Sequence, residues 1–375
     1  MRHVFVDKNA NYTKGIGIDR VRILLGNGIM TSEGELWRRQ RKMIQPAFHR
    51  DVISRMFADI RDANLQLRKT WLEHASRGLE IDLTQFLSDV TLKIVLKAIF
   101  GADMEAIEST AGGNPFMLLM QETERNLQFA YKFRALSKFV TECLARRRAD
   151  APGDDLLGML IASRDRRTDD PMTERQLVDE VLTLIVAGHE TTASALNWLW
   201  YLLARNPRVE SRMHEEIDAW DESNADINSV LQLTYTRQVI EETLRLYPPG
   251  WLLTRRSIDA DVIGENPIDA NTDVFISPYL VHRHPAFWEN PEKFDPDRFS
   301  PSQKAQRNRF CYLPFALGPR ACIGEHFAMV EMIAHTALIA RKIRLRYLRD
   351  EPVEMECQVN LRPRQSIMMR LEKRQ

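Results

Sequence analysis

Cys322 has the clearest chemical potential in this chain of 375 residues. Gly318 and Gly324 flank it and a helical pattern follows, so we expect a tight turn that leads into the N-terminus of a helix. Backbone amides at such a position stabilise a thiolate, the form of cysteine that binds metal ions. The alternative is a small buried hydrophobic residue. Zinc fits poorly, because Cys311 is too distant for a C-x-x-C pair and only His326 could share a helix face with Cys322.

A second group of polar residues, His189, Glu190 and Thr191, interrupts a long apolar helix pattern. The zinc protease pattern H-E-x-x-H would need a second histidine at position 193, which is alanine, so that interpretation fails. Polar groups in the middle of an apolar helix still need a specific reason, because their burial is costly.

Two further pairs of residues have helical spacing. Glu242 and Arg245 are three residues apart and share one face of a helix, where an exposed ion pair would contribute little to stability. Trp37 and Arg41 share a helix face in the same way. Taken alone, the segment around them is most simply a solvated basic face or a weak nucleic-acid patch.

Together these positions resemble a known family. The segment from Phe315 to Gly324 is similar to the haem-binding loop of the cytochromes P450, in which phenylalanine, glycine, arginine, cysteine and glycine occur at these spacings. Ala316 stands where many members have glycine, which is a mild change. The resemblance implies that Phe315 and Gly324 form part of the cofactor site. It also implies that the Cys322 thiolate is the iron ligand of haem b.

The resemblance also assigns roles to the other segments. It implies that Glu190 and Thr191 are catalytic and face the distal side of the iron, where a carboxylate and a hydroxyl relay and donate protons. The alternative for Thr191 is a hydroxyl that bonds a carbonyl of its own helix. The resemblance joins Glu242 and Arg245 to Arg298 in a buried charge network beside the haem loop, with a structural role.

Four residues are implied as binding residues for the haem propionates: Trp37, Arg41, Arg255 and Arg320. Guanidinium groups match carboxylates in geometry and in charge, so the assignment has a physical basis. Arg256 competes with Arg255, because a shift of one residue along a strand turns the other side chain inward.

The elements that position these residues are mainly helical. We expect a helix of about thirty residues with Thr173 as its N-cap, closed by the Asn206-Pro207 pair. Another helix must end before the Pro248-Pro249 pair, because proline lacks the amide donor. Short apolar segments between polar and Gly/Pro breaks then predict β structure.

The expected fold is therefore mainly α with a small β region, in one domain that spans residues 1–375. The helix-rich parts are 37–247 and 322–340, and the β-rich parts are 251–276 and 343–371. The resemblance implies the cytochrome P450 fold. It also implies that two family features are shortened or missing: the part that normally precedes His3 and the helix-loop-helix lid near residues 127–133.

Composition limits the partners and the compartment. The 52 Lys and Arg residues balance the 52 Asp and Glu residues, so no global field attracts nucleic acid or an anionic membrane surface. Four cysteines are too few for a disulfide scaffold and fit a reducing compartment. The sequence contains neither a run of eighteen apolar residues nor a signal peptide, so we expect no membrane segment and a cytoplasmic location.

The resemblance implies a haem-thiolate monooxygenase. Two electrons and two protons split dioxygen, one atom becomes water and the other enters a C-H bond of a hydrophobic small molecule. Because the chain shows no flavin or iron-sulfur domain, the electrons are expected from a separate donor, a ferredoxin, flavodoxin or flavoprotein reductase. The alternatives are a haem-thiolate peroxygenase or isomerase that needs no reductase, and a haem sensor without turnover.

Overall fold

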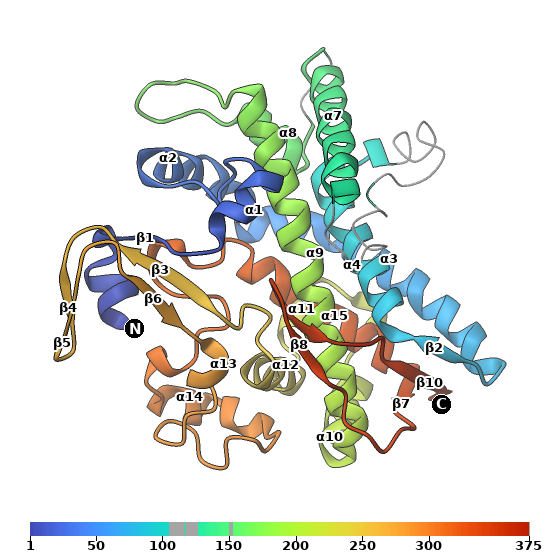
Figure 1. The fold of residues 1–375 in the computed structure, drawn as a ribbon. Coiled ribbons are helices and arrows are strands. Elements are labelled where there is room, and N and C mark those ends of the chain that lie inside the picture. The colour runs from blue at the N-terminus through green and yellow to red at the C-terminus, as the bar shows by residue number, and fades with distance from the viewer. Residues whose placement is uncertain (105–115, 117–126, 150–152, 375) are drawn as a thin grey trace.

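The computed structural model describes residues 1–104, 116, 127–149 and 153–374, and helices dominate it (Figure 1). The α-helices in these ranges are α1 (Ile18–Leu25), α2 (Gly34–Ile44), α3 (Arg50–Ser76), α4 (Leu83–Phe100), α7 (Leu127–Ala149), α8 (Leu156–Ala162), α9 (Glu174–Arg205), α10 (Pro207–Ala219), α11 (Ile227–Leu231), α12 (Thr234–Leu246), α13 (Pro278–Val281), α14 (Pro301–Gln306) and α15 (Glu325–Ala340). Short helical turns include η1 (His3–Asp7), η6 (Pro296–Phe299) and η8 (Gly318–Arg320).

The strands of the described residues are short. They are β1 (Tyr12–Lys14), β2 (Glu80–Asp82), β3 (Leu253–Ser257), β4 (Asp261–Ile263), β5 (Asn266–Ile268), β6 (Asp273–Ile276), β7 (Ile343–Arg346), β8 (Met355–Cys357), β9 (Leu361–Pro363) and β10 (Met368–Lys373). Figure 1 shows β1 and β3 to β6 on one side of the helical body, β2, β7 and β10 on the other, and β8 near the middle of the view. One sheet has the order β1-β3-β6 and another β2-β10-β7, while β4 with β5 and β8 with β9 form two-stranded sheets. The predicted class, mainly α with a small β region, is confirmed.

The long helix α9 runs through the middle of the molecule (Figure 1). Its N-terminus has the capping box that the sequence predicts: Thr173 Oγ1 accepts from the Gln176 amide at 3.2 Å, and Gln176 Oε1 accepts from the Thr173 amide at 2.9 Å. Asn206 ends the helix and Pro207 begins α10. The predicted helix is therefore confirmed.

The helix α12 ends before the proline pair, as expected, with Leu246 as its last residue. The next residue, Tyr247, stacks on Trp198 of α9 with ring centroids 3.9 Å apart. This contact fixes the end of α12 against the central helix. Because α12 carries Glu242 and Arg245, the same contact helps to position that pair.

The sequence predicts the shortened lid near residues 127–133, and the neighbouring residues 105–115 and 117–126 lie outside the described part of the chain. Residues 127–149 form one continuous helix, α7. In the described ranges, no helix combines the length and the apolar character that a membrane crossing needs.

Candidate active site and cofactor site

Cys322 lies where the sequence predicts, in a tight loop that leads into α15, whose N-cap is Gly324. The loop closes on itself, because the Cys322 amide donates to the Phe315 carbonyl at 2.8 Å. Gly318 has φ +74°, and a Cβ built there would lie 1.9 Å from the carbonyl oxygen of Phe5 in η1, so only glycine fits. Ala316 has φ 60°, a left-handed conformation, which gives a reason why glycine is the easier residue at this position.

The electrostatics of the cysteine follow from its position. Burial is the largest effect and raises the pKa of the Cys322 thiol, while the backbone amides of Gly324 and Glu325 and the charge of Arg41 oppose the shift. These are the helix-start amides that a thiolate ligand requires. The residues of the loop are half-buried or exposed, and Cys322 itself is exposed and lines a cavity. A free thiol that opens on an internal cavity suits a metal ligand better than a packing residue.

The cavity measures about 330 Å³ and lies between α9 and the cysteine loop. Five of the predicted residues line it: Thr191, Phe315, Arg320, Cys322 and Gly324. The sequence reasoning missed the apolar residues that make up most of the wall, among them Val95, Ala98, Leu184, Ala187, Ala195 and Met332. Those on α9 recur every three or four residues, a spacing that identifies one helix face and could have revealed them.

The two predicted catalytic residues of α9 point in different directions. Thr191 lines the cavity, and its hydroxyl donates to the Ala187 carbonyl at 2.8 Å, which is the alternative that the sequence left open. Glu190 does not line the cavity. Its Oε2 accepts from Asn360 Nδ2 at 3.1 Å, beside β9. The structure therefore brings the hydroxyl to the cavity and directs the carboxylate toward the C-terminal strands.

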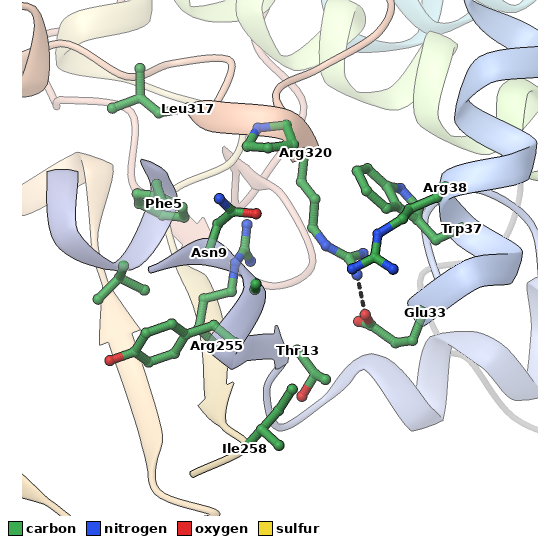
Figure 2. Close-up of a pocket in the computed structure, with 15 residues that line it drawn as sticks. Phe5, Asn9, Thr13, Glu33, Trp37, Arg38, Arg255, Ile258, Leu317 and Arg320 are labelled. Atoms are coloured by element: carbon green, nitrogen blue, oxygen red, sulfur yellow. Dashed lines mark hydrogen bonds and ion pairs between the residues drawn. The ribbon is translucent and has the colours of Figure 1, made fainter. Parts of the chain in front are cut away.

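A second, smaller pocket of about 120 Å³ adjoins the cavity, because Arg320 lines both (Figure 2). Figure 2 shows the Arg320 guanidinium directed toward Glu33, its ion-pair partner, and toward Trp37, whose ring centroid lies 4.3 Å from it. Arg255 enters the same pocket from β3 and is only 8% exposed. Arg256 instead pairs with Asp273 at 2.7 Å, outside the pocket. Of the two candidate arginines for the propionates, Arg255 is therefore the one that faces the pocket.

This pocket holds more buried cations than anions. Burial, followed by the neighbouring Arg320, lowers the pKa of Arg255 to about 10. The same two causes lower the pKa of Lys14, which lies beside the pocket, to about 7. Glu33 is the carboxylate that opposes these three cations. A group with two carboxylates would supply the missing negative charge, so the pocket fits the propionates of a haem.

Arg41 lies apart from these residues. Its Nη1 donates to the Ala321 carbonyl at 2.9 Å, and its side chain lines a separate concave surface together with Ile323 of the cysteine loop. The structure therefore groups Trp37, Arg255 and Arg320 in the pocket but does not bring Arg41 into it. Lys14 and Glu33 belong to the pocket cluster, and the sequence reasoning missed both.

Glu242 and Arg245 are fully buried and form a bidentate ion pair, with Arg245 Nε 2.6 Å and Nη2 2.8 Å from the two carboxylate oxygens. Arg245 also donates to the carbonyls of His282, Pro291 and Lys293. Each of its five N-H groups therefore has an acceptor. Burial raises the pKa of Glu242, and the bonds from Arg245 oppose that shift.

Arg298 joins this pair from η6, with its Nε 3.4 Å from Glu242 Oε1. The network reaches the cysteine loop through His282, whose Nε2 accepts from the Leu313 amide at 2.9 Å, just before the loop begins at Phe315. The three segments that the sequence reasoning combined are thus in contact.

Comparisons with known proteins agree with this geometry. The family model described as "Cytochrome P450" matches residues 1–132 and 113–370. Cyclooctatin synthase of Streptomyces melanosporofaciens is 32% identical, over 96% of this chain and 82% of that protein. Cyclooctat-9-en-7-ol 5-monooxygenase of the same organism is 31% identical, over 89% of this chain and 76% of that protein.

Solved structures share the fold. The crystal structure of a cytochrome P450, CYP102L1, has a TM-score of 0.87 and 25% identity, covering 98% of this chain and 87% of that chain. The heme domain of cytochrome P450DA has a TM-score of 0.86 and 24% identity, covering 98% and 85%. In the described part of the chain, no group of three or more His, Cys, Asp or Glu side chains is placed to hold a metal ion. With its cysteine loop, its buried cationic pocket and a family match over almost its whole length, this chain belongs to the cytochrome P450 family of haem monooxygenases.

Proposed function

We propose that this protein hydroxylates an unsaturated hydrocarbon, or such a hydrocarbon that already carries one hydroxyl group, with haem b held by Cys322. The observation that carries the proposal is the position of Cys322, which lines the same apolar cavity as the α9 stripe that includes Thr191. The candidate iron ligand and the candidate proton donor therefore line one cavity, which also has room for an apolar substrate.

The cavity wall supports the substrate class. The α9 positions that line the cavity before Thr191 are Leu184, Ala187 and Gly188, and none of them offers a polar side chain. Its volume of about 330 Å³ is within the usual range for small-molecule sites. Two relatives, cyclooctat-9-en-7-ol 5-monooxygenase and pentalenene oxygenase, act by their names on an unsaturated alcohol and an unsaturated hydrocarbon. An apolar wall suits either skeleton.

Bound haem supplies the reductive activation of dioxygen, and one oxygen atom enters the substrate while the other leaves as water. The chain's own residues hold the cofactor and move protons. Cys322 binds the iron, and the amides of Gly324 and Glu325 stabilise the negative charge of its sulfur. Arg255 and Arg320 pair with the propionates, because Glu33 alone does not balance the buried positive charges of these arginines.

Protons reach the cavity through α9 in this proposal. Thr191 Oγ1 donates to the Ala187 carbonyl, and rotation of the hydroxyl directs the same proton into the cavity. Glu190 accepts a hydrogen bond from Asn360 on the side of the C-terminal strands, and as a relay it would take up a proton from water there and pass it on toward Thr191. The carboxylate is therefore a proton relay, and the hydroxyl is the final donor.

The electron donor is proposed to dock on the concave surface that Arg41 lines beside the cysteine loop. This surface encloses about 560 Å³, and Ile323 and Glu325 form part of it next to the loop. Arg41, Arg50 and Arg237 also line it. An acidic ferredoxin, flavodoxin or reductase would complement these cations, and its association rate would fall as salt rises. The four unpaired cysteines support a reducing compartment such as the cytoplasm.

The first test is the difference spectrum of the reduced, carbon monoxide-treated protein, in parallel with Cys322→Ser and the exposed control Cys357→Ser. We expect a thiolate-type Soret band in the parent and in the control, and its loss in Cys322→Ser. A parent without this band, or a band that survives in Cys322→Ser, would refute the proposal.

A second measurement separates the alternative functions. A peroxygenase forms product from hydrogen peroxide, whereas the proposed monooxygenase needs reductant and dioxygen and keeps its activity when catalase removes peroxide. A haem sensor would bind carbon monoxide without forming product under either condition.

A further inference from the structure

The loop of residues 26–32, called here the α1–α2 loop, packs unusually closely on α9. A Cβ built on Gly26 would lie 2.2 Å from Asp179 Oδ1, and one built on Gly28 would lie 2.2 Å from Thr183 Oγ1. Only glycine therefore allows this approach at either position. The loop is fixed directly against the N-terminal half of the helix that forms the cavity wall.

Two consecutive carboxylates of α9 hold the backbone of this loop. Asp179 Oδ2 accepts from the Asn27 amide at 2.8 Å, and Glu180 Oε2 accepts from the Ile29 amide at 2.8 Å. Glu180 is completely buried, and its second oxygen has no hydrogen-bond partner. One backbone hydrogen bond offsets only part of the desolvation of an acidic side chain at that depth, so the burial of Glu180 is costly.

Lys14 also holds this loop. Its Nζ donates to the Ile29 carbonyl at 3.1 Å and to the Met30 carbonyl. The peptide groups around Ile29 are therefore held at the amide by Glu180 and at the carbonyl by Lys14. Both side chains act on backbone atoms, so together they fix the position of the loop.

The end of the loop reaches the propionate pocket. The Ser32 carbonyl accepts from Arg320 Nη1 at 3.3 Å, and Glu33, the next residue, forms an ion pair with the same arginine. Glu33 also accepts from the Lys14 amide at 2.7 Å. A displacement of the loop would therefore move Arg320 and Glu33, which face the cofactor carboxylates.

We propose that Lys14 and Glu180 are positioning residues for the propionate pocket, and that their titration makes haem retention dependent on pH. The inference rests on the haem site of the proposed function. It adds two residues and a regulatory property to that site.

The charges around the two residues support this assignment. Burial is the main cause that raises the pKa of Glu180 to about 8; Asp179 raises it further, while the Ile29 amide and Lys14 oppose the shift. For Lys14, burial is again the main cause of a pKa lowered to about 7. Arg320, Arg255 and Arg22 add to that shift and Glu33 opposes it.

The direction of the effect follows. As pH rises through 7 and 8, Lys14 loses its positive charge and Glu180 becomes negative. Each change makes the potential beside the propionates less positive, so haem is held less tightly. Below this pH range of about 7 to 8, both groups are protonated, so the retention of haem no longer changes with pH.

The test measures transfer of haem from the loaded protein to an excess of apomyoglobin at several pH values. We expect the transfer rate of the parent to rise from the acid to the alkaline side of pH 7 to 8 by about tenfold for each of the two unit charges that change. Lys14→Arg keeps the cation at every pH, and Glu180→Gln keeps an acceptor for the Ile29 amide without titrating. Each single variant should show a smaller increase of the haem transfer rate with pH than the parent. In the double variant the transfer rate should not change with pH.

The exposed lysine Lys69 provides the matched control, because Lys69→Arg should reproduce the parent profile. Circular dichroism checks that each variant is folded, which both substitutions favour because they preserve the hydrogen bonds to the loop. Profiles of Lys14→Arg and Glu180→Gln that parallel the parent would overturn the inference while leaving the haem site intact. Absence of a thiolate-type haem in the parent would instead refute the proposed function itself, and the inference with it.

Discussion

Arg245→Ala removes a side chain that uses all of its hydrogen-bond donors inside the folded protein. In the parent, two of these bonds go to Glu242 and the other three go to carbonyls of the segment between His282 and Lys293. After the substitution, Glu242 stays buried with the Asp295 amide at 2.8 Å and the more distant Arg298 at 3.4 Å. The mutation therefore leaves a nearly uncompensated charge in the core.

The expected cost follows from that charge. Breaking a buried ion pair on one side costs about 3 to 5 kcal/mol. The whole unfolding free energy of a protein is about 5 to 15 kcal/mol, so the loss is a large part of the total. At about 2 °C per kcal/mol, the melting temperature should fall by roughly 6 to 10 °C. Haem content should fall with it, because the network adjoins the cysteine loop.

Thermal unfolding followed by circular dichroism provides the assay, with Arg364→Ala as the control. Arg364 is 57% exposed and pairs with Glu354, which is 67% exposed, so its removal should cost less than about 1 kcal/mol. Arg245→Lys keeps the charge but offers three donors for five bonds, and should lie between the two. If Arg245→Ala melts within about 2 °C of the control, the network does not stabilise the fold as argued.

Four further outcomes are expected. Thr191→Ala should retain haem and divert electrons into hydrogen peroxide; an unchanged ratio of product to electrons consumed would argue against the proton-donor role. Arg320→Ala removes a propionate partner, so haem content after gel filtration should fall below that of the parent, and equal content would exclude the assignment. Gly28→Ala places a Cβ against Thr183 and should lower the unfolding free energy by about 1 to 3 kcal/mol in urea titration, unless the loop does not pack as described. Burial lowers the pKa of His335 to about 3. Below pH 6.5 the imidazole of His335 is therefore protonated in the unfolded chain and still neutral in the folded chain. The free energy of unfolding should fall toward pH 3 by up to about 1.4 kcal/mol per pH unit. His335→Gln should reduce that slope, and an identical slope would contradict the neutral state of the imidazole.

The sequence predicted the elements whose signals are local. Thr173, followed by Gln176 and an apolar pattern, identifies the start of α9, because a capping box acts within one helical turn. Gly318 identifies the cysteine loop, because backbone conformation and close approach restrict the residue type there. The spacing of Glu242 and Arg245 likewise predicts their pairing.

Features that depend on distant partners were not predictable in the same way. Alternation along β3 places Arg255 and Arg256 on opposite faces, and the choice between them depends on Asp273 of the neighbouring strand. Lys14 and Glu180 bind backbone atoms of the α1–α2 loop, and backbone groups leave no signature of residue type. The roles of Arg255, Lys14 and Glu180 therefore depend on tertiary contacts that the sequence does not indicate.

The continuity of α9 also limits how this protein can change in evolution. One helix presents Asp179 to the α1–α2 loop, Thr191 to the cavity, and Trp200 to His335, whose Nε2 accepts from the indole at 3.0 Å. One residue inserted or deleted between these points would rotate everything beyond it by about 100°. Each later side chain would then face the wrong neighbour. Within this stretch the lineage can exchange residues but cannot alter their number, and changes in length must fall in the connecting loops.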